Sequence, residues 1–455
     1  MRFIAIPHKD MPAVWKTPTS KKSRISKIDG WGIKDLKGHP KVRKKGIIKY
    51  NPSISLLKQN KNSCDYMMIY RATMPCVTDG KRPKEPRGHY RYNSTMWDTN
   101  WNLCWDGVGM CQIKVYDDGK IKVKNDTIPV EETSYVLDAR LVFWRNDFHM
   151  IYNRYTKYGW FPNSNPDLEG CTKSSLCITM ETHPIEITKK TMRSLGQPRI
   201  LCRDKHTKFE KNWSLVIPVE KKRLIHYSFI PQMKFLSSDH EDGAEESDKC
   251  VWKISPKSEI FMELFKYYKE VLPPLVANGI AVTTPLINFD KNHWIGIGRV
   301  KIDYKKMNFK ANIGKTKLGK FMDILRKVLG IPNTEPADWF KYSAAVHDSL
   351  LYFSFFYTVN KKTLGIGKFS PCYLPQCPDV SYFASITFPV SIQPFTKNNF
   401  AISLGISDID CGIITVSRKE LRDMMIYTNR SKPSDVDFQI QNFEAPLLPF
   451  QQKKK

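Results

Sequence analysis

The chain has 455 residues, with 72 Lys or Arg against 45 Asp or Glu and a formal net charge of +27. The length allows one large all-β domain or two ordinary domains. The charge predicts contact with polyanions through a basic surface, although the cations are interleaved with apolar residues, as on a solvated surface.

The eleven cysteines are scattered and contain no CxxC pair, so they indicate neither a zinc cluster nor a disulfide framework and predict reduced thiols. No signal-peptide core and no run of about 18 apolar residues occurs, which predicts a cytoplasmic protein without a transmembrane segment. Motifs of P-loop, zincin and serine-hydrolase enzymes are absent. Asp408-Ile409-Asp410 has a D-x-D spacing that is common by chance, and we expect no metal.

Three regions follow from the patterning: a basic N-terminal arm over 1–46, a strand-rich domain over 47–430, and a polar tail over 431–455. The domain begins with the predicted strands Ile47–Leu57 and Asp65–Thr73. Asn51-Pro52-Ser53 interrupts the first of them, because proline cannot donate to a ladder. An interrupted strand exposes polar side chains at the end of a sheet.

The next hairpin, Ser134–Phe143 with Phe148–Thr156, turns through the polar residues 145–147. Its first strand is apolar except for Asp138 and Arg140. Alternation along a strand predicts that both side chains lie on one face. The two residues form either a structural ion pair or the start of a site.

Further predicted hairpins and helices follow in the chain. The predicted hairpins are Trp213–Val219 with Leu224–Ile230, Ala281–Phe289 with His293–Ile302, and Leu350–Val359 with Thr363–Lys368. A last set consists of Ala384–Ile392, Phe400–Leu404 and Gly412–Val416, closed by a short helix over Arg418–Tyr427. Helical insertions are predicted near 255–272 and 315–347, and an acidic solvent loop over Leu236–Lys249.

The hairpins recur without βαβ alternation, which favours antiparallel sheets repeated around an axis. The count of strand sets predicts an all-β fold, a five-bladed β-propeller with a basic N-terminal arm and small helical insertions. A two-sheet sandwich with a helical cap is the rival architecture.

Several short segments resemble, in the same order, motifs of five-bladed-propeller carbohydrate-active enzymes, the β-mannoside phosphorylases and β-1,2-mannosyltransferases. They are Asn51-Pro52-Ser53, Leu137-Asp138-Ala139-Arg140 with Tyr152 and Tyr155-Thr156, Glu210-Lys211-Asn212-Trp213-Ser214, Thr283-Thr284-Pro285, His293 with Gly296-Ile297-Gly298-Arg299, and Ser403-Leu404-Gly405 with Asp408. The resemblance implies a sugar bound at the propeller axis and glycosyl transfer with inversion. It also implies a single aspartate as proton donor, with phosphate as nucleophile in the phosphorylases.

The resemblance implies a catalytic role for Asp138. It implies substrate binding by Asn51, Ser53, Arg140, Tyr155, Lys211, Asn212, Trp213, Thr284, His293, Arg299 and Asp408. His226 lies in the predicted partner strand of Trp213–Val219 and could face the same pocket to bind substrate. Arg140, Lys211, His226 and Arg299 could hold a phosphate or a nucleotide-sugar diphosphate. An alternative interpretation of Trp213 and His226 is that both are core side chains.

The chain departs from the family pattern at some positions: Leu137 stands where glutamate is usual, Ala139 replaces proline, and Arg299 replaces histidine. Two functions therefore stay open. The first is inverting glycosyl transfer on a mannose-like sugar, by a transferase, phosphorylase or hydrolase, without a cofactor but with inorganic phosphate, a sugar phosphate or a nucleotide sugar as co-substrate. The second is a non-catalytic basic propeller that binds glycans or nucleic acid. The oligomeric state stays open.

Overall fold

The structure is a computed structural model, and it describes the residues in the ranges 2–5, 48–75, 103–124, 136–144, 147–157, 176–187, 192–194, 199–202, 205, 212–216, 224–229, 233–238, 250–256, 280–303, 350–376, 387–406, 410–428 and 438–442. Strands dominate these ranges, which confirms the all-β expectation. No helix in the described part is long and apolar enough to cross a membrane.

The strands form five separate sheets. Sheets 1 to 5 are numbered by the order in the chain of β2, β6, β11, β15 and β21, which belong to one sheet each. Sheet 1 contains β2 (Ile48–Gln59), β3 (Ser63–Pro75), β4 (Leu103–Tyr116) and β5 (Ile121–Lys124). Sheet 2 contains β6 (Val136–Trp144), β7 (Asp147–Lys157), β8 (Leu176–Ile187), β9 (Met192–Ser194) and β10 (Arg199–Ile200). Sheet 3 contains β11 (Ser214–Leu215), β12 (Leu224–Ser228), β13 (Lys234–Ser238) and β14 (Cys250–Ile254).

Sheet 4 is the largest and includes a strand from the C-terminal tail. It contains β15 (Ile280–Val282), β16 (Ile287–Asn288), β17 (His293–Asp303), β18 (Leu350–Asn360), β19 (Ile366–Phe369), β20 (Cys372–Gln376), β24 (Tyr427–Thr428) and β25 (Phe438–Asn442). Sheet 5 contains β21 (Thr387–Pro394), β22 (Asn399–Ile406), β23 (Asp410–Ser417) and β1 (Arg2–Ala5). A 3-10 turn (Thr396–Asn398) precedes β22, and the helix α5 (Arg418–Met424) follows β23.

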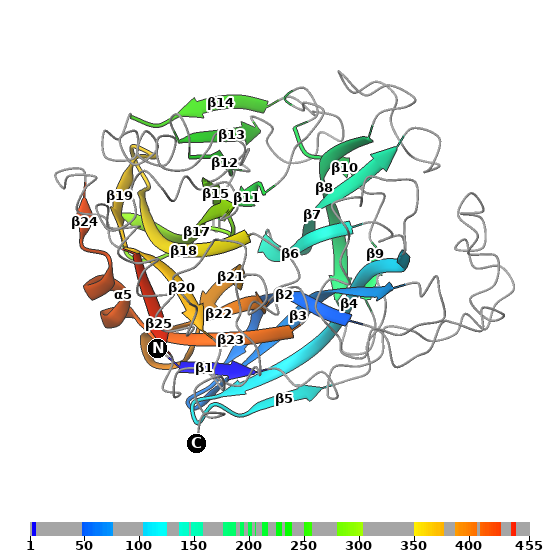
Figure 1. Cartoon of the computed structure of the whole chain (residues 1–455), viewed down its shortest axis with the longest axis horizontal. Helices are drawn as coiled ribbons and strands as arrows, with labels where there is room; N and C mark the ends of the chain where they lie inside the picture. The colour runs from blue at the N-terminus through cyan, green and yellow to red at the C-terminus, as the bar shows by residue number, and fades with distance from the viewer. Residues whose placement is uncertain are drawn as a thin grey trace, which may run out of the picture.

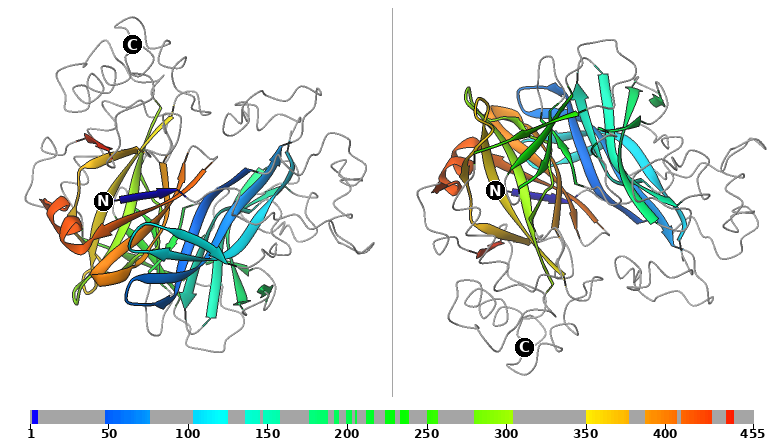
Figure 2. Two further views of the ribbon diagram at one scale, coloured as in Figure 1. Left: turned by 90° about the horizontal axis from the view of Figure 1, so that it is seen from below. Right: turned by 90° about the horizontal axis from the view of Figure 1, so that it is seen from above.

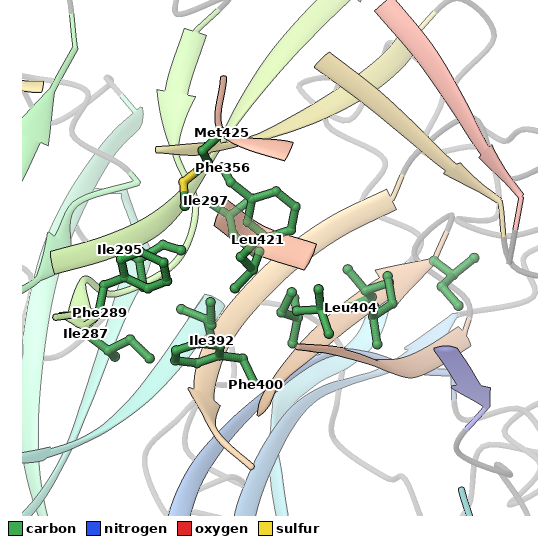
Figure 3. Packing of buried hydrophobic residues seen from close by; sticks show 14 residues of the cluster. Ile287, Phe289, Ile295, Ile297, Phe356, Ile392, Phe400, Leu404, Leu421 and Met425 are labelled. Atoms are coloured by element: carbon green, nitrogen blue, oxygen red, sulfur yellow. The ribbon is translucent and has the colours of Figure 1, made fainter. Parts of the chain in front are cut away.

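Each sheet packs against the next through apolar side chains. On β3, Tyr66 and Met68 face sheet 5 whereas Met67 and Ile69 face sheet 2, as alternation along a strand requires. Other buried clusters join sheets 2 and 3, and sheets 4 and 5 (Figure 3). Sheets 3 and 4 meet at a parallel bridge between Val216 and Leu286. In Figure 1, β2, β6, β11, β15 and β21 lie towards the middle of the view, and Figure 2 shows the same strands from below and from above.

Serine hydroxyls connect these inner strands. Ser53 Oγ in sheet 1 accepts a hydrogen bond of 2.9 Å from the Leu141 amide in sheet 2. Ser391 Oγ in sheet 5 accepts one of 2.8 Å from the Ile54 amide in sheet 1. Both serines are buried, so each bond satisfies a backbone donor that water cannot reach. The two bonds hold β2 in register with β6 and with β21.

The inner strands are also irregular where they approach one another. The pairing register shifts between Tyr50 and Ser53 on β2 and between Leu137 and Arg140 on β6. Three residues near these points have left-handed backbones: Asn51 (φ 50°), Asp138 (φ 48°) and Asn212 (φ 65°). Asn and Asp tolerate this conformation best among residues with a side chain. Bulges of this kind redirect a side chain and are common beside active sites.

The hairpins predicted from the sequence are present in sheets 1, 2, 4 and 5, with ends displaced by a few residues. In sheet 3, β11 and β12 lie within the predicted strands, and the turn between them lies outside the described residues. The predicted helices near 255–272 and 315–347, and residues 6–46 of the arm, also lie largely or wholly outside them.

Four expectations need correction. The predicted loop over Leu236–Lys249 begins inside β13, and the predicted tail contains β25, which pairs in parallel with β20. The start of the arm forms β1, which pairs with β23. The cysteines are not all reduced: Cys202 and Cys250 form a disulfide, because the packing of sheets 2 and 3 brings their Cα atoms to 5.3 Å. The reducing, cytoplasmic compartment stays a prediction.

Candidate active site

Asp138 lies at the bulge of β6 and is held by a residue from sheet 1. Its Oδ1 accepts a hydrogen bond of 3.0 Å from Asn51 Nδ2. Its Oδ2 has no hydrogen-bond partner among the described residues, and the side chain is only partly buried. One carboxylate oxygen is therefore fixed, and the other is available to a ligand.

The bulge also changes the relation between Asp138 and Arg140. The shift of register breaks the alternation that predicts both side chains on one face. Arg140 Nη1 donates to the Asp138 backbone carbonyl at 3.4 Å, and the guanidinium forms no ion pair with the carboxylate. A structural ion pair between these two residues, the alternative derived from the sequence, is not formed.

Arg140 extends from sheet 2 to sheet 4. Its Nε donates a hydrogen bond of 2.6 Å to the Thr283 carbonyl, which lies between β15 and β16. The side chain is fully buried, and its Nη2 has no partner among the described residues. Burial lowers the pKa of Arg140 from 12.5 to about 10; Arg299 lowers it further, and Asp138 opposes the shift. Arg140 is thus a buried cation without a full set of acceptors.

Arg299, in β17, is a second buried cation. Its guanidinium carbon lies 4.9 Å from the centre of the Tyr352 ring and 5.1 Å from that of Phe388. Its Nε has no hydrogen-bond partner, and it pairs with no carboxylate within the described ranges. Two buried guanidiniums that influence each other electrostatically and lack paired carboxylates favour an anionic ligand.

Asn212 and Asn153 add unused polar atoms near the bulge of β6. Asn153 lies opposite Leu137 in the ladder, and its Oδ1 accepts a hydrogen bond of 3.3 Å from the Asn212 amide. Asn153 Nδ2 and Asn212 Oδ1 are buried, and neither has a partner in the described part of the chain. Sequence reasoning missed Asn153, although an uncharged polar residue after the apolar run 150–152 was a usable signal.

Several residues predicted to bind substrate hold the framework. Ser53 connects sheets 1 and 2, and Thr284 Oγ1 accepts a hydrogen bond of 2.9 Å from the Ile297 amide. The Trp213 indole is buried in the cluster between sheets 2 and 3, with its ring centre 5.2 Å from that of Tyr227. His293 pairs with Asp290 at the turn before β17, six residues from Arg299.

His226 is surrounded by aromatic rings. It stacks on Phe235 with ring centres 4.8 Å apart, and its Nδ1 lies 3.0 Å from the Tyr357 hydroxyl. Burial lowers its pKa from 6.5 to about 3, so the imidazole is neutral at physiological pH. A neutral imidazole cannot act as a cation for phosphate.

The structure thus brings Asn51, Asp138 and Arg140 together, with Asn212 and Arg299 nearby through Asn153 and Arg140. The side chains of Tyr155, Lys211 and Asp408 lie outside the described residues. Among the described side chains, no group of three His, Cys, Asp or Glu could hold a metal ion, and the absence of a cofactor stays a prediction.

No protein-family model matches the chain, and no curated protein matches it by sequence. Solved structures with a similar course of the chain include a β-1,2-mannobiose phosphorylase from Listeria innocua, at TM-score 0.42 and 7% identity, covering 93% of this chain and 99% of that chain. A GDP-Man-dependent mannosyltransferase from Leishmania mexicana has TM-score 0.41 and 9% identity, covering 82% and 86%. A mannose phosphorylase from the same organism has TM-score 0.40 and 10% identity, covering 87% and 90%. A likeness at TM-scores below 0.5 establishes no shared activity.

Proposed function

We propose that the protein is a carbohydrate-active enzyme that carries out inverting glycosyl transfer on a mannose-like sugar. Asp138 is the acid or base in this proposal, and Arg140 and Arg299 bind an anionic co-substrate. The observation that carries the proposal is a partly exposed carboxylate, fixed through one oxygen by Asn51, beside the buried guanidinium of Arg140, which in turn interacts with the buried guanidinium of Arg299; neither guanidinium has a carboxylate partner at ion-pair distance among the described residues. The resemblance of the Asn51, Asp138 and Thr283 segments to phosphorylase motifs supports the same assignment.

We also propose that the five sheets are the blades of a propeller. Sheets 1 to 5 pack in chain order, and sheet 5 packs on sheet 1, as a radial arrangement requires. Such an arrangement collects the first strand of every sheet around one axis. It explains why Arg140 of sheet 2 can reach the Thr283 carbonyl of sheet 4.

The chemistry follows from the charges. Inverting transfer needs one acid to protonate the leaving oxygen and a nucleophile that enters from the opposite face of the sugar. When the nucleophile is phosphate, cations and N–H donors replace the second carboxylate. Asp138 Oδ2 is available to donate the proton, and the unpartnered Nη2 of Arg140 and Nε of Arg299 are available to the anion. Phosphorolysis is therefore the reaction that this arrangement supports best.

Among the sequence-derived candidates, the geometry favours Asn51, Asp138, Arg140, Asn212 and Arg299 as the working site. We propose Tyr155, Lys211 and Asp408 as sugar contacts on the resemblance alone. Ser53, Trp213, His226 and Thr284 support the site from the framework, and His293 belongs to a turn.

The test measures release of mannose 1-phosphate from β-mannobioses and inorganic phosphate, and transfer from GDP-mannose. We expect Asp138→Asn to abolish turnover while the protein still binds phosphate, measured as a rise in melting temperature. Asp147→Asn, at an exposed position at the start of β7 in the same sheet, is the matched control and should keep full activity. A wild type that shows no turnover on any mannoside, but salt-sensitive binding of nucleic acid, would replace the proposal with the non-catalytic alternative.

A further inference from the structure

Gly405 on β22 lies directly against Asn51. A Cβ atom on Gly405 would overlap Asn51 Oδ1 and would lie 2.9 Å from Asn51 Cγ and 3.1 Å from its Cα. No side chain can occupy this position while the Asn51 amide keeps its place. Glycine at 405 therefore provides the space that the amide needs.

The Asn51 amide is in turn the one group among the described residues that orients the Asp138 carboxyl. Arg140 contacts only the backbone carbonyl of Asp138, and Oδ2 has no partner in the described part. The left-handed backbones of Asn51 and Asp138, which come from two different sheets, aim the two side chains at each other. Because both residues joined by this hydrogen bond have a left-handed backbone, the bond indicates a positioning role for Asn51.

The direction of this bond decides where a proton can reside. Asn51 Nδ2 can only donate, so Oδ1 accepts in both protonation states of the carboxyl group. A carbonyl oxygen accepts more strongly than the hydroxyl oxygen of a carboxylic acid, so this bond favours a proton on Oδ2, the oxygen available to a ligand. We propose that Asn51 and Gly405 are positioning residues that place the acidic proton of Asp138 on Oδ2, an inference that rests on the proposed function.

During transfer the Oδ2–H bond breaks and the proton passes to the glycosidic oxygen, which keeps the electron pair of the broken C–O bond. The nucleophile, inorganic phosphate, forms the new C–O bond from the opposite face. A proton on Oδ1 could not reach the leaving oxygen without rotation of the carboxyl group. The Asn51 bond disfavours that unproductive arrangement.

The test displaces the amide without changing Asp138. Gly405→Ala pushes the Asn51 side chain away, and Asn51→Gly removes it while tolerating the left-handed backbone. We expect either variant to lower kcat by about tenfold to hundredfold. The loss should fall on kcat rather than on the KM for phosphate, because neither substitution touches Arg140 or Arg299.

A double variant separates positioning from general damage. If the methyl group that Gly405→Ala introduces acts only through the Asn51 side chain, this substitution should add little to Asn51→Gly. Gly365→Ala is the matched control, because its Cβ would meet no atom closer than 3.2 Å and it lies in the β18–β19 turn. Additive losses in the double variant, or an unchanged kcat in both single variants, would overturn the assignment.

A second measurement does not depend on turnover. Carbodiimide modifies carboxyl groups, so labelling of the Asp138 peptide at one fixed pH, followed by mass spectrometry, reports the reactivity of this carboxyl group. The extent of labelling should change in Asn51→Gly and match the wild type in Gly365→Ala. Unchanged labelling in Asn51→Gly refutes the positioning role. Changed labelling in an enzyme without turnover retains the role and refutes the proposed function, and Asn51→Gly carries the test if Gly405→Ala does not fold.

Discussion

Replacing Arg140 with methionine should leave the fold almost as stable as the wild type while abolishing phosphate binding. Burial of a large charged side chain usually makes its replacement destabilising. Arg140 differs because its charge is buried without a carboxylate partner. The predicted separation of stability from binding follows from that difference.

The magnitude follows from two opposing contributions. The pKa of Arg140 falls from 12.5 to about 10 in the folded protein, so burying the charge at neutral pH costs about 3 kcal/mol, at about 1.4 kcal/mol per pKa unit. Methionine removes that cost and fills a similar volume. It also removes the bond from Nε to the Thr283 carbonyl, and a hydrogen bond from a charged donor contributes about 1.5 to 3 kcal/mol. The free energy of unfolding should therefore change by no more than about 1 to 2 kcal/mol.

Urea unfolding at pH 7, followed by tryptophan fluorescence, measures this change. Arg140→Lys is the informative partner variant, because it keeps the charge but loses the planar guanidinium that reaches the Thr283 carbonyl. We expect the lysine variant to be the less stable of the two. The reasoning is wrong if the methionine variant is the less stable, or if phosphate still raises its melting temperature as in the wild type.

Three further predictions concern the framework. Reduction of the Cys202–Cys250 disulfide, which closes a separation of 48 residues, should lower the free energy of unfolding by about 4 kcal/mol in the chain-entropy treatment, measured by urea unfolding with and without a reductant; an unchanged midpoint would contradict this. His226 has a folded-state pKa of about 3 against 6.5 when unfolded, so stability should fall by up to about 1.4 kcal/mol for each pH unit from 6.5 towards 3, and His226→Gln should flatten this dependence. Trp213→Ala should destabilise the protein by about 3 to 5 kcal/mol, because the indole is buried in the core; a loss of sugar affinity at unchanged stability would instead indicate a surface platform.

The strands were predictable because their patterns are local. β2, β3, β6 and β7 are rich in apolar and aromatic residues and are joined by short polar turns, so residue type and spacing suffice to place them. The ends moved by a few residues, because pairing with a neighbouring strand, which the sequence does not display, decides where a ladder stops.

The site was predictable only in part, since its geometry depends on contacts between sheets. Alternation placed Asp138 and Arg140 on one face, but the bulge of β6 separates their roles: the carboxylate bonds Asn51, and the guanidinium bonds Thr283. Asn153 belongs to no recognisable motif, and it lies near the site because it stands opposite Leu137 in the ladder. Polar and aromatic residues such as His226 have the same sequence appearance in a core as in a site, and only burial distinguishes the two.

The pairing of β1 with β23 has a consequence for synthesis. Arg2 aligns with Thr415, so β1 has its ladder partner about 400 residues later in the chain. At about 5 to 20 residues per second, the edge of sheet 5 waits on the order of half a minute before it can be completed. A chaperone bound to β1 during synthesis would therefore act on sheet 5, whose last strand is made after the strands of sheets 1 to 3.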